Sequence, residues 1–169
     1  MKKTLLICSC IFAMCSYSQS RVNLTLHHDA RLLFIGDNKG NDALTANLFF
    51  KAEIPIKKFS NSYLLVYPGA EFAQLVGGSY QRYSAGAAYV FTEIINKVGA
   101  GVFVDYGKII RQGDDYSSYS VSGELTYKLS NRWKLSMIYQ LTERADLKAL
   151  YNSKQKHIGS GFIGLKFRL

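Results

Sequence analysis

An alternation of apolar and polar residues, repeated along almost the whole chain, constrains the fold more than any other feature of the sequence. Residues 133–142, WKLSMIYQLT, place Trp133, Leu135, Met137, Tyr139 and Leu141 on one side of an extended strand. Side chains alternate between two faces in a strand, whereas a helix repeats every 3.6 residues, so this period predicts β-structure. The period of two recurs in eight segments: residues 22–34, 44–54, 63–74, 82–92, 98–106, 119–129, 133–142 and 156–169.

The connections between these segments alternate in length. Short sequences, KKFSNS, INK and SNR, join segments two to three, four to five and six to seven, while most of the other connections are longer and richer in Gly, Asn and Asp. Eight strands with tight turns at one end and longer loops at the other are typical of an up-and-down barrel of an outer membrane. We therefore predict an all-β, eight-stranded antiparallel transmembrane barrel, with recognition carried by loops 35–43, 107–118 and 145–155.

The choice between a soluble and a membrane barrel depends on which face points outward, because both kinds alternate. Three features favour an apolar face toward lipid: that face is nearly free of polar residues, its aromatic residues gather toward strand ends, and small residues are common on the opposite face. The aromatic residues expected in the two girdles are Phe91, Tyr127, Trp133 and Phe167 at one end and Phe34, Tyr83, Tyr106 and Tyr119 at the other.

The polar face of the predicted strands carries charges of both signs. Buried charges must be paired and hydrogen-bonded, so we predict an ion-pair network that closes the lumen. The alternative is a gated ion path along the same charges, whereas a general diffusion porin needs a wider barrel than eight strands give. The predicted network consists of Asp29, Arg31, Lys51, Glu53, Glu71, Arg82, Asp105, Glu124, Lys128, Lys134, Lys166 and Arg168.

The N-terminal residues have the layout of a secretory signal peptide. Lys2 and Lys3 precede a short apolar run, and Ser16 and Ser18 occupy the small-residue positions of a cleavage site before Gln19. We predict a signal peptide over residues 1–18 and a barrel domain over residues 19–169. The alternatives are a buried N-terminal helix and a lipoprotein signal ending at Cys15.

Removal of this leader changes what chemistry the mature chain can perform. Cys8, Cys10 and Cys15 all lie within it, which leaves no disulfide, thiolate ligand or thiol nucleophile in the mature chain. The net charge falls from +9 to +7 when Lys2 and Lys3 are lost. No Lys/Arg run exceeds two residues, so nucleic acid is not an expected partner. No later stretch approaches 18 uninterrupted apolar residues, which excludes a transmembrane helix from the prediction.

The last eight residues, FIGLKFRL, resemble the C-terminal recognition signal of outer-membrane β-barrel proteins. Gly164 and Phe167 match that pattern, while Leu169 replaces the usual terminal aromatic residue and Phe162 stands where a polar residue is usual. From about Arg21 to Leu169 the pattern is similar to the small eight-stranded barrels related to OmpX and the OmpA transmembrane domain. The resemblance implies an outer-membrane location, contact with membrane lipid, and recognition of Gly164, Phe167 and Leu169 by the barrel-assembly machinery.

Our first hypothesis for the function is a non-enzymatic protein with a structural or loop-mediated binding or adhesion role. Two alternatives remain: a lipid A-modifying enzyme, and a barrel subunit of a secretion or conjugation complex. His157 and Ser160 are three residues apart and face opposite sides of a strand, whereas the lipid A deacylases place a Ser two positions after the His. His27 and His28 have no Ser close by in sequence. We therefore predict no catalytic residue, metal site or cofactor.

Two residues fit the predicted strands badly. His28 falls on the lipid face of the first segment, where an imidazole is tolerable only near an interface. Pro68 interrupts the third segment, and a closed barrel has no edge strand on which its missing N–H would be harmless. We predict a bulge or kink at Pro68.

Overall fold

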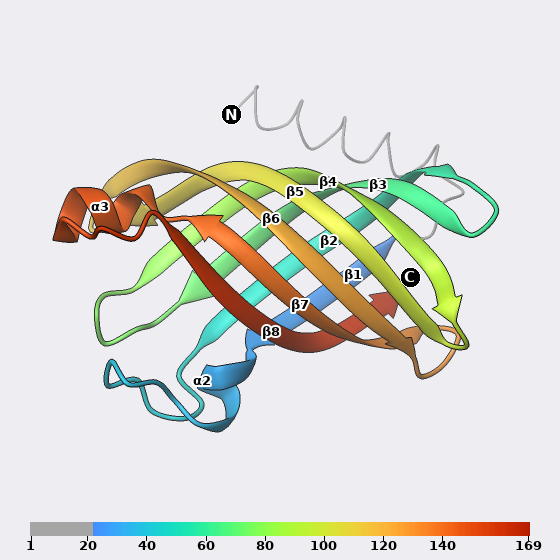
Figure 1. The fold of residues 1–169 in the computed structure, drawn as a ribbon, viewed down its shortest axis with the longest axis horizontal. Coiled ribbons are helices and arrows are strands. Elements are labelled where there is room, and N and C mark those ends of the chain that lie inside the picture. The colour runs from blue at the N-terminus through green and yellow to red at the C-terminus, as the bar shows by residue number, and fades with distance from the viewer. Residues whose placement is uncertain (1–21) are drawn as a thin grey trace, which may run out of the picture.

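The computed structural model describes residues 22–169, and the predicted signal peptide lies outside them. Eight antiparallel strands, each hydrogen-bonded to its neighbours in sequence, close into a barrel between β1 and β8, which confirms the predicted fold (Figure 1). The strands are β1 (Asn23–Asp29), β2 (Asn47–Lys58), β3 (Ser62–Ala73), β4 (Tyr80–Ile95), β5 (Val98–Arg111), β6 (Asp114–Lys128), β7 (Trp133–Glu143) and β8 (His157–Arg168). Two short helices, α2 (Ala30–Phe34) and α3 (Ala145–Tyr151), follow β1 and β7.

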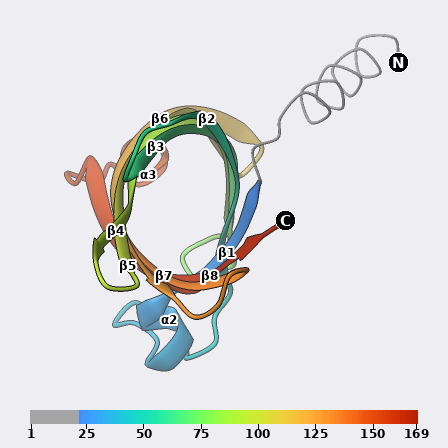
Figure 2. The same ribbon diagram turned by 90° about the vertical axis from the view of Figure 1, so that its right-hand side faces the viewer.

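The barrel closes where the first strand pairs with the last (Figure 2). The register runs from Asn23 opposite Arg168 to Asp29 opposite Phe162. Gly164 lies opposite His27, and a Cβ atom there would lie 2.0 Å from the carbonyl oxygen of Leu26. No side chain fits at that distance, so a glycine at this position is a condition for closing the two strands.

The apolar face of the strands points outward. Val102, Leu125 and Met137 expose more than half of their surface, although each lies within a strand that is paired on both sides. The inward positions are mostly buried and many are polar, including Ser120 and Gln140 at 1% exposure. A continuous exposed apolar band of this extent is not expected on a soluble monomer, so the arrangement is that of a barrel immersed in lipid.

The two ends of the barrel differ in their connections (Figure 1). At the end we name the turn end, residues 59–61, 96–97 and 129–132 connect the strands, and the described chain both begins and ends there. At the opposite loop end lie residues 30–46, 74–79, 112–113 and 144–156. The three tight turns predicted from the sequence are therefore confirmed.

The first predicted strand is too long. The chain leaves the sheet after Asp29, whose carboxylate accepts hydrogen bonds from the backbone N–H groups of Arg31 and Leu32 and so caps α2. The Arg31 side chain is 58% exposed and lies 3.6 Å from Asp37, so its prediction as a lumen residue is wrong. Phe34 lies in α2 rather than in a strand girdle. The alternation over these residues is also compatible with one short helical turn.

Other boundaries differ because polar strands extend beyond the apolar band. Residues 107–118 are a continuation of β5 and β6, joined by a tight turn at Gln112 and Gly113, both with positive φ, and are not the predicted loop. The second strand begins at Asn47 rather than at residue 44 and continues to Lys58. Loop 145–155 contains α3. The Gly and Asp residues in segment 107–118 led to the prediction of a loop. In the structure, cross-strand pairing between β5 and β6 continues through this segment up to the tight turn.

Pro68 lies inside a regular part of β3, contrary to the predicted bulge. The ladder with β4 runs through Pro68, opposite Ala85. Pairing with β2 is missing between Gly69 and Val66 but resumes in the same register, so the strand has no bulge at Pro68. The irregularity in register falls instead between Pro55 and Lys57 in β2. His28 is half-buried near the loop end of β1, where its Nδ1 lies 2.9 Å from the carbonyl oxygen of Asp29.

Within residues 22–169, neither helix has the length and apolar character to cross a membrane.

We predict that Val102→Arg destabilises the folded barrel by up to about 2–4 kcal/mol, the cost of a charge at the bilayer midplane, because Val102 lies in the outward band of β5. Unfolding by urea in lipid vesicles measures this loss. Val76→Arg is the matched control, because Val76 is also exposed, at 73% against 58% for Val102, but lies in a connection at the loop end. Equal unfolding midpoints for the two variants would contradict the lipid-facing assignment.

Candidate functional site

The lumen holds a cluster of opposite charges toward the turn end. The ammonium of Lys166 lies 2.9 Å from a carboxylate oxygen of Glu53 and 2.9 Å from one of Glu124. Lys51 lies 3.4 Å from Glu53, and its ammonium stands 3.8 Å from the centroid of the Phe103 ring. All four charged residues are buried, so their charges are compensated by one another and by the aromatic face.

A second cluster occupies the middle of the lumen. Arg82 forms an ion pair with Asp105 and donates from Nε to the Ser118 hydroxyl at 3.1 Å. The Asp105 carboxylate also accepts hydrogen bonds from Tyr67 at 2.9 Å and from Ser120 at 2.7 Å. This carboxylate is satisfied on several sides, as a buried charge in a narrow barrel requires.

A His–Ser contact lies in the same interior. His27 Nε2 is 2.8 Å from the Ser136 hydroxyl, and that hydroxyl donates to Glu124. Since the hydroxyl proton is directed at the carboxylate, Nε2 must donate to the oxygen, which leaves Nδ1 as an acceptor, and Nδ1 has no protein partner. A base has to accept the proton of its nucleophile, so this geometry is not that of an activated serine. Both side chains are fully buried.

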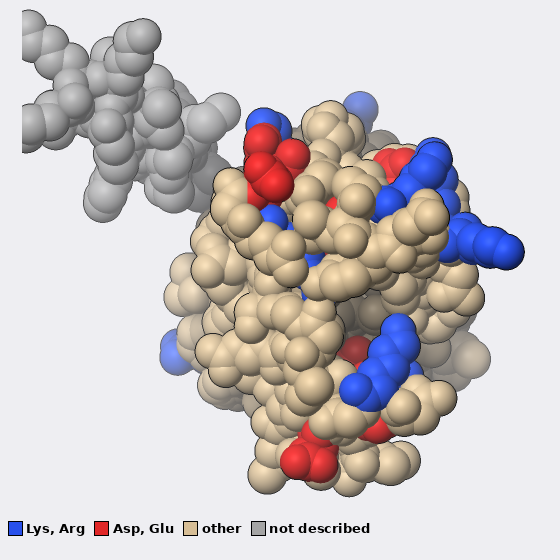
Figure 3. Space-filling model, turned by 90° about the vertical axis from the view of Figure 1, so that its left-hand side faces the viewer, with Lys and Arg blue, Asp and Glu red and all other residues tan. Residues whose placement is uncertain are grey.

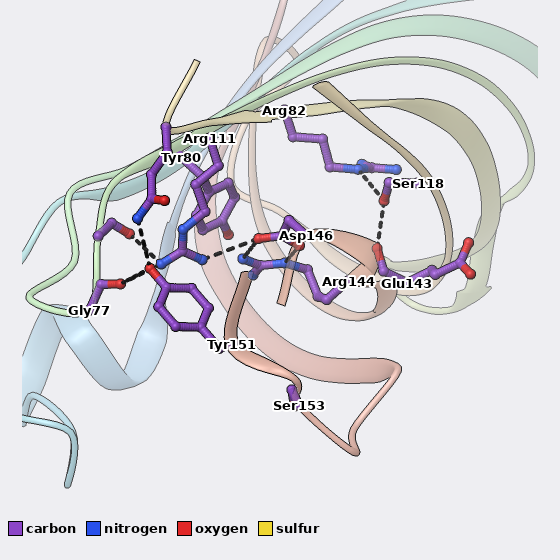
Figure 4. Close-up of polar contacts among 12 residues, drawn as sticks. Gly77, Tyr80, Arg82, Arg111, Ser118, Glu143, Arg144, Asp146, Tyr151 and Ser153 are labelled. Carbon is purple, nitrogen blue, oxygen red and sulfur yellow. Dashed lines mark hydrogen bonds and ion pairs between the residues drawn. The ribbon is translucent and has the colours of Figure 1, made fainter. Parts of the chain in front are cut away.

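The loop end carries a polar clamp centred on Asp146 in α3 (Figure 4). Arg144 donates two hydrogen bonds of 2.8 Å to its carboxylate, and Arg111 at the end of β5 donates a third at 3.1 Å. Asp146 itself has no exposed surface. One carboxylate therefore joins the segment after β7 to the β5–β6 hairpin.

The same clamp reaches the connection between β3 and β4. The guanidinium of Arg111 donates to the carbonyl oxygens of Gly77 and Gly78 at 2.5 and 2.9 Å. Tyr151, at the end of α3, donates to the Gly77 carbonyl at 3.1 Å (Figure 4). Arg144 stacks 4.2 Å above the Tyr80 ring. These contacts hold α3 as a lid across part of the opening.

The sequence alone did not identify the clamp residues Arg111, Arg144 and Asp146. Arg111 lies in a segment that the sequence indicates as a loop, although the alternation of β5, once extended, places it on the inward face. Asp146 lies in α3 and Arg144 directly precedes it, and this seven-residue helix has no strand periodicity. The only available signal was the continuation of period two through residues 107–111.

The titration of Asp146 follows from its two arginine partners. Burial alone raises the pKa of this carboxyl, but the hydrogen bonds and charges of Arg144 and Arg111 outweigh it and hold the pKa below its usual range. The contribution of the Asp146 carboxylate to holding α3 is therefore complete above the ordinary aspartate pKa of about 3.9. It is lost only as pH falls through the lowered pKa.

The structure places the predicted lumen charges in three environments. Buried on the inward face are Asp29, Lys51, Glu53, Glu71, Arg82, Asp105, Glu124 and Lys166. Lys128, Lys134 and Arg168 point inward at the turn end, are partly or largely exposed, and form no ion pair with any of residues 22–169. Arg31 lies outside the barrel.

A small void lies in the lumen on the loop-end side of its centre. A void of about 10 Å³ lies between the second cluster and the clamp, lined by residues that include Glu71, Tyr80 and Arg144. Such a volume holds at most one water molecule. At the loop end, basic and acidic side chains lie mainly around the rim (Figure 3). Residues 22–169 contain no group of three His, Asp or Glu side chains placed to hold a metal ion.

A closed ring of eight antiparallel strands with an apolar outer band and a charged interior defines a small transmembrane β-barrel. The same fold is found in the outer-membrane protein Ail of Yersinia pestis, studied in a phospholipid nanodisc, with a TM-score of 0.57 and 12% identity over 89% of this chain and all of that one. A de novo designed transmembrane β-barrel aligns with a TM-score of 0.51 and 11% identity over 90% of this chain and 98% of the design. No protein-family model matches the sequence, and no curated protein is significantly similar to it.

We predict that Asp146→Asn releases the lid. Removing the charge leaves the guanidinium groups of Arg144 and Arg111 without their shared partner, at a local cost of about 1–3 kcal/mol. Cleavage by trypsin after Lys148 and Lys154 should become faster in the folded protein, while the barrel keeps its heat-modifiable gel mobility. Hydrogen exchange of the backbone amides of α3 is the second measurement. Its control is Lys148→Gln, which removes a nearby exposed charge and leaves the clamp intact. Unchanged protection of α3 in Asp146→Asn would show that the clamp does not hold the lid.

Proposed function

We propose that this chain is a non-enzymatic integral protein of a Gram-negative-type outer membrane, with a closed lumen and a binding or adhesion role carried by the loop end. The observation that carries the proposal is the combination of an apolar outer band with a lumen filled by paired charges. The first feature demands a bilayer, and the second leaves no route for a large solute.

The lumen supports a structural role more strongly than conduction. An ion path needs sites that an ion can enter and leave, whereas Lys166 is held by two carboxylates and Arg82 by Asp105 and Ser118. The clamp on Asp146 adds a further barrier at the loop end. The proposed network therefore fixes the barrel shape and closes it to ions.

The loop end presents exposed apolar side chains that lie in connections and not in the lipid-facing aromatic girdle of the strands. Phe34, Ile35 and Leu44 lie in the connection between β1 and β2, and Val76 lies in that between β3 and β4; each is at least 67% exposed. Tyr151 adds a half-exposed aromatic ring on α3. Exposed apolar and aromatic residues on connections held by a rigid scaffold favour recognition of a partner outside the cell.

The lipid A-modifying alternative has little support from the side-chain geometry. Ser136, the hydroxyl beside His27, is enclosed in the lumen and out of reach of lipid. On the outer face the Nε2 atom of His157 lies 2.7 Å from the Tyr119 hydroxyl, so its side-chain partner is a tyrosine and not the serine of the lipid A deacylases. A role as a subunit of an envelope complex is compatible with the same barrel. In that case the partner subunits would contact the turn end.

Topology tests the proposal directly. Single cysteines at Asn38, Asp114 and Asn152 lie at the loop end and should react with an impermeant thiol reagent on intact cells. Cysteines at Asn61 and Asn131 lie at the turn end and should react only after lysis. The mature chain contains no other cysteine if the leader is removed, so each signal reports one position. Labelling of the turn-end positions on intact cells would reverse the proposed orientation.

We further propose that Gly164, Phe167 and Leu169 act as an assembly signal. Deletion of residues 167–169 removes the rung between Phe167 and Leu24, and leaves backbone groups beside lipid unpaired at several kcal/mol each. The deleted chain should accumulate in the periplasm and be degraded, whereas Leu169→Phe should insert at least as well as the native chain. Heat-modifiable mobility of the membrane fraction measures both. A folded band at native abundance from the deleted chain would leave these residues as an ordinary strand end.

A further inference from the structure

The charges of the two ends differ, and the turn end is strongly basic. Among residues 22–169 its turns and strand ends carry acidic groups only at Glu93 and the C-terminal carboxylate. The basic residues there are Lys57, Lys58, Lys97, Lys128, Arg132, Lys134 and Arg168. At the loop end, by contrast, acids and bases are mixed and several are paired, as at Asp146 and between Lys156 and Glu143.

Five of these residues form a continuous row, which we name the basic arc: Lys97, Lys128, Arg132, Lys134 and Arg168. Lys128 lies directly opposite Lys134 on β6 and β7. The backbone N–H of Lys128 donates to the carbonyl of Lys97 at 2.8 Å, and that of Arg168 donates to the carbonyl of Arg132 at 2.8 Å. The arc therefore runs from the β4–β5 turn across β6 and β7 to the end of β8 (Figure 2).

None of the five cations forms an ion pair within residues 22–169. The nearest lumen carboxylates, Glu53 and Glu124, already contact Lys166, and Glu53 also contacts Lys51. Lys166 is the cross-strand neighbour of Lys134, so it places a further positive charge, and not a compensating negative one, beside the arc. Like charges placed directly opposite in a sheet are destabilising, which makes an added anion favourable here.

The orientation of the arc separates it from the lipid. Lys128, Lys134 and Arg168 occupy inward positions, while the residues beside them, Tyr127 and Trp133, point outward and are 45% exposed. Outward aromatic residues at a strand end occupy the headgroup level. A ligand of the arc therefore approaches along the barrel axis from the turn end and not through the bilayer.

We propose that the basic arc binds an acidic peptide segment of a protein on the turn-end side of the membrane, which is the periplasm in the orientation proposed above. Neighbouring strands lie about 4.8 Å apart, so cations on β6, β7 and β8 form a row that carboxylates along an extended segment can follow. Two of the five are arginines, which bind carboxylates through two parallel hydrogen bonds. This partner lies beyond the loop-mediated role, which concerns the opposite end.

A fluorescent hexaglutamate peptide tests the proposal on the folded mature barrel in neutral detergent micelles. The native protein should bind the peptide, and binding should weaken as salt rises. The test variant combines Lys128→Gln, Lys134→Gln and Arg168→Gln. It should bind about tenfold more weakly, as expected for the loss of three solvent-accessible charge contacts.

A matched variant at the loop end separates a built surface from diffuse attraction by net charge. This control combines Lys39→Gln, Lys148→Gln and Lys154→Gln, which remove the same charge from residues without an ion pair in the described chain. Its affinity should stay within about twofold of the native value. Equal losses in the two triple variants, or no loss in the turn-end variant, would overturn the proposal.

Binding to vesicles distinguishes lipid phosphate from the peptide as the ligand. If the turn-end variant loses a preference for phosphatidylglycerol over phosphatidylcholine while its peptide affinity is unchanged, the arc is a lipid-binding surface and the proposal is wrong. If the triple variant does not show the heat-modifiable folded band, Arg168→Gln alone replaces it, because Arg168 is exposed at the strand end. That single variant should bind the peptide about twofold to threefold more weakly.

Discussion

The rest of this structure depends on the absence of water beside the barrel wall. A backbone N–H or C=O group without a partner costs several kcal/mol in hydrocarbon, so every strand must be paired on both sides. The pairing of β1 with β8 supplies the last ladder, and Gly164 allows it because a side chain there would overlap the backbone of β1. Beyond the apolar band, β5 and β6 stay paired up to the tight turn at Gln112 and Gly113, where water is available and the pairing is not required by lipid.

Closure with eight strands produces an interior too narrow for bulk water. The inward charges must therefore be compensated by other side chains. Lys166 contacts two carboxylates, Arg82 contacts one carboxylate and a hydroxyl, and Lys51 lies over an aromatic ring. Arg82 and Asp105 lie on the adjacent strands β4 and β5, whereas Lys166 reaches from β8 to β2 and β6, so the clusters brace the barrel from within. Removing one partner would leave the other charge buried and unpaired, which is more costly than the pair is favourable.

The two ends are free of these constraints and differ accordingly. The loop end combines a clamped lid with exposed apolar side chains, while the turn end has short connections and an unpaired basic arc. A barrel whose lumen is closed can still carry separate contacts on its two sides. The proposed outer partner and the proposed acidic segment therefore involve different residues and are separable by mutation.

The sequence by itself determined the class, strand number and direction of the faces, because a period of two is a local property that eight segments repeat. It also identified eight of the buried lumen charges, since each lies on the polar side of a strand. It did not locate the end of β1, where the Asp29 carboxylate caps a helix, nor the clamp of Arg111, Arg144 and Asp146. Those features depend on which connections meet above the lumen. Only the tertiary structure decided this, because contacts between segments far apart in sequence follow from the closure and register of the barrel.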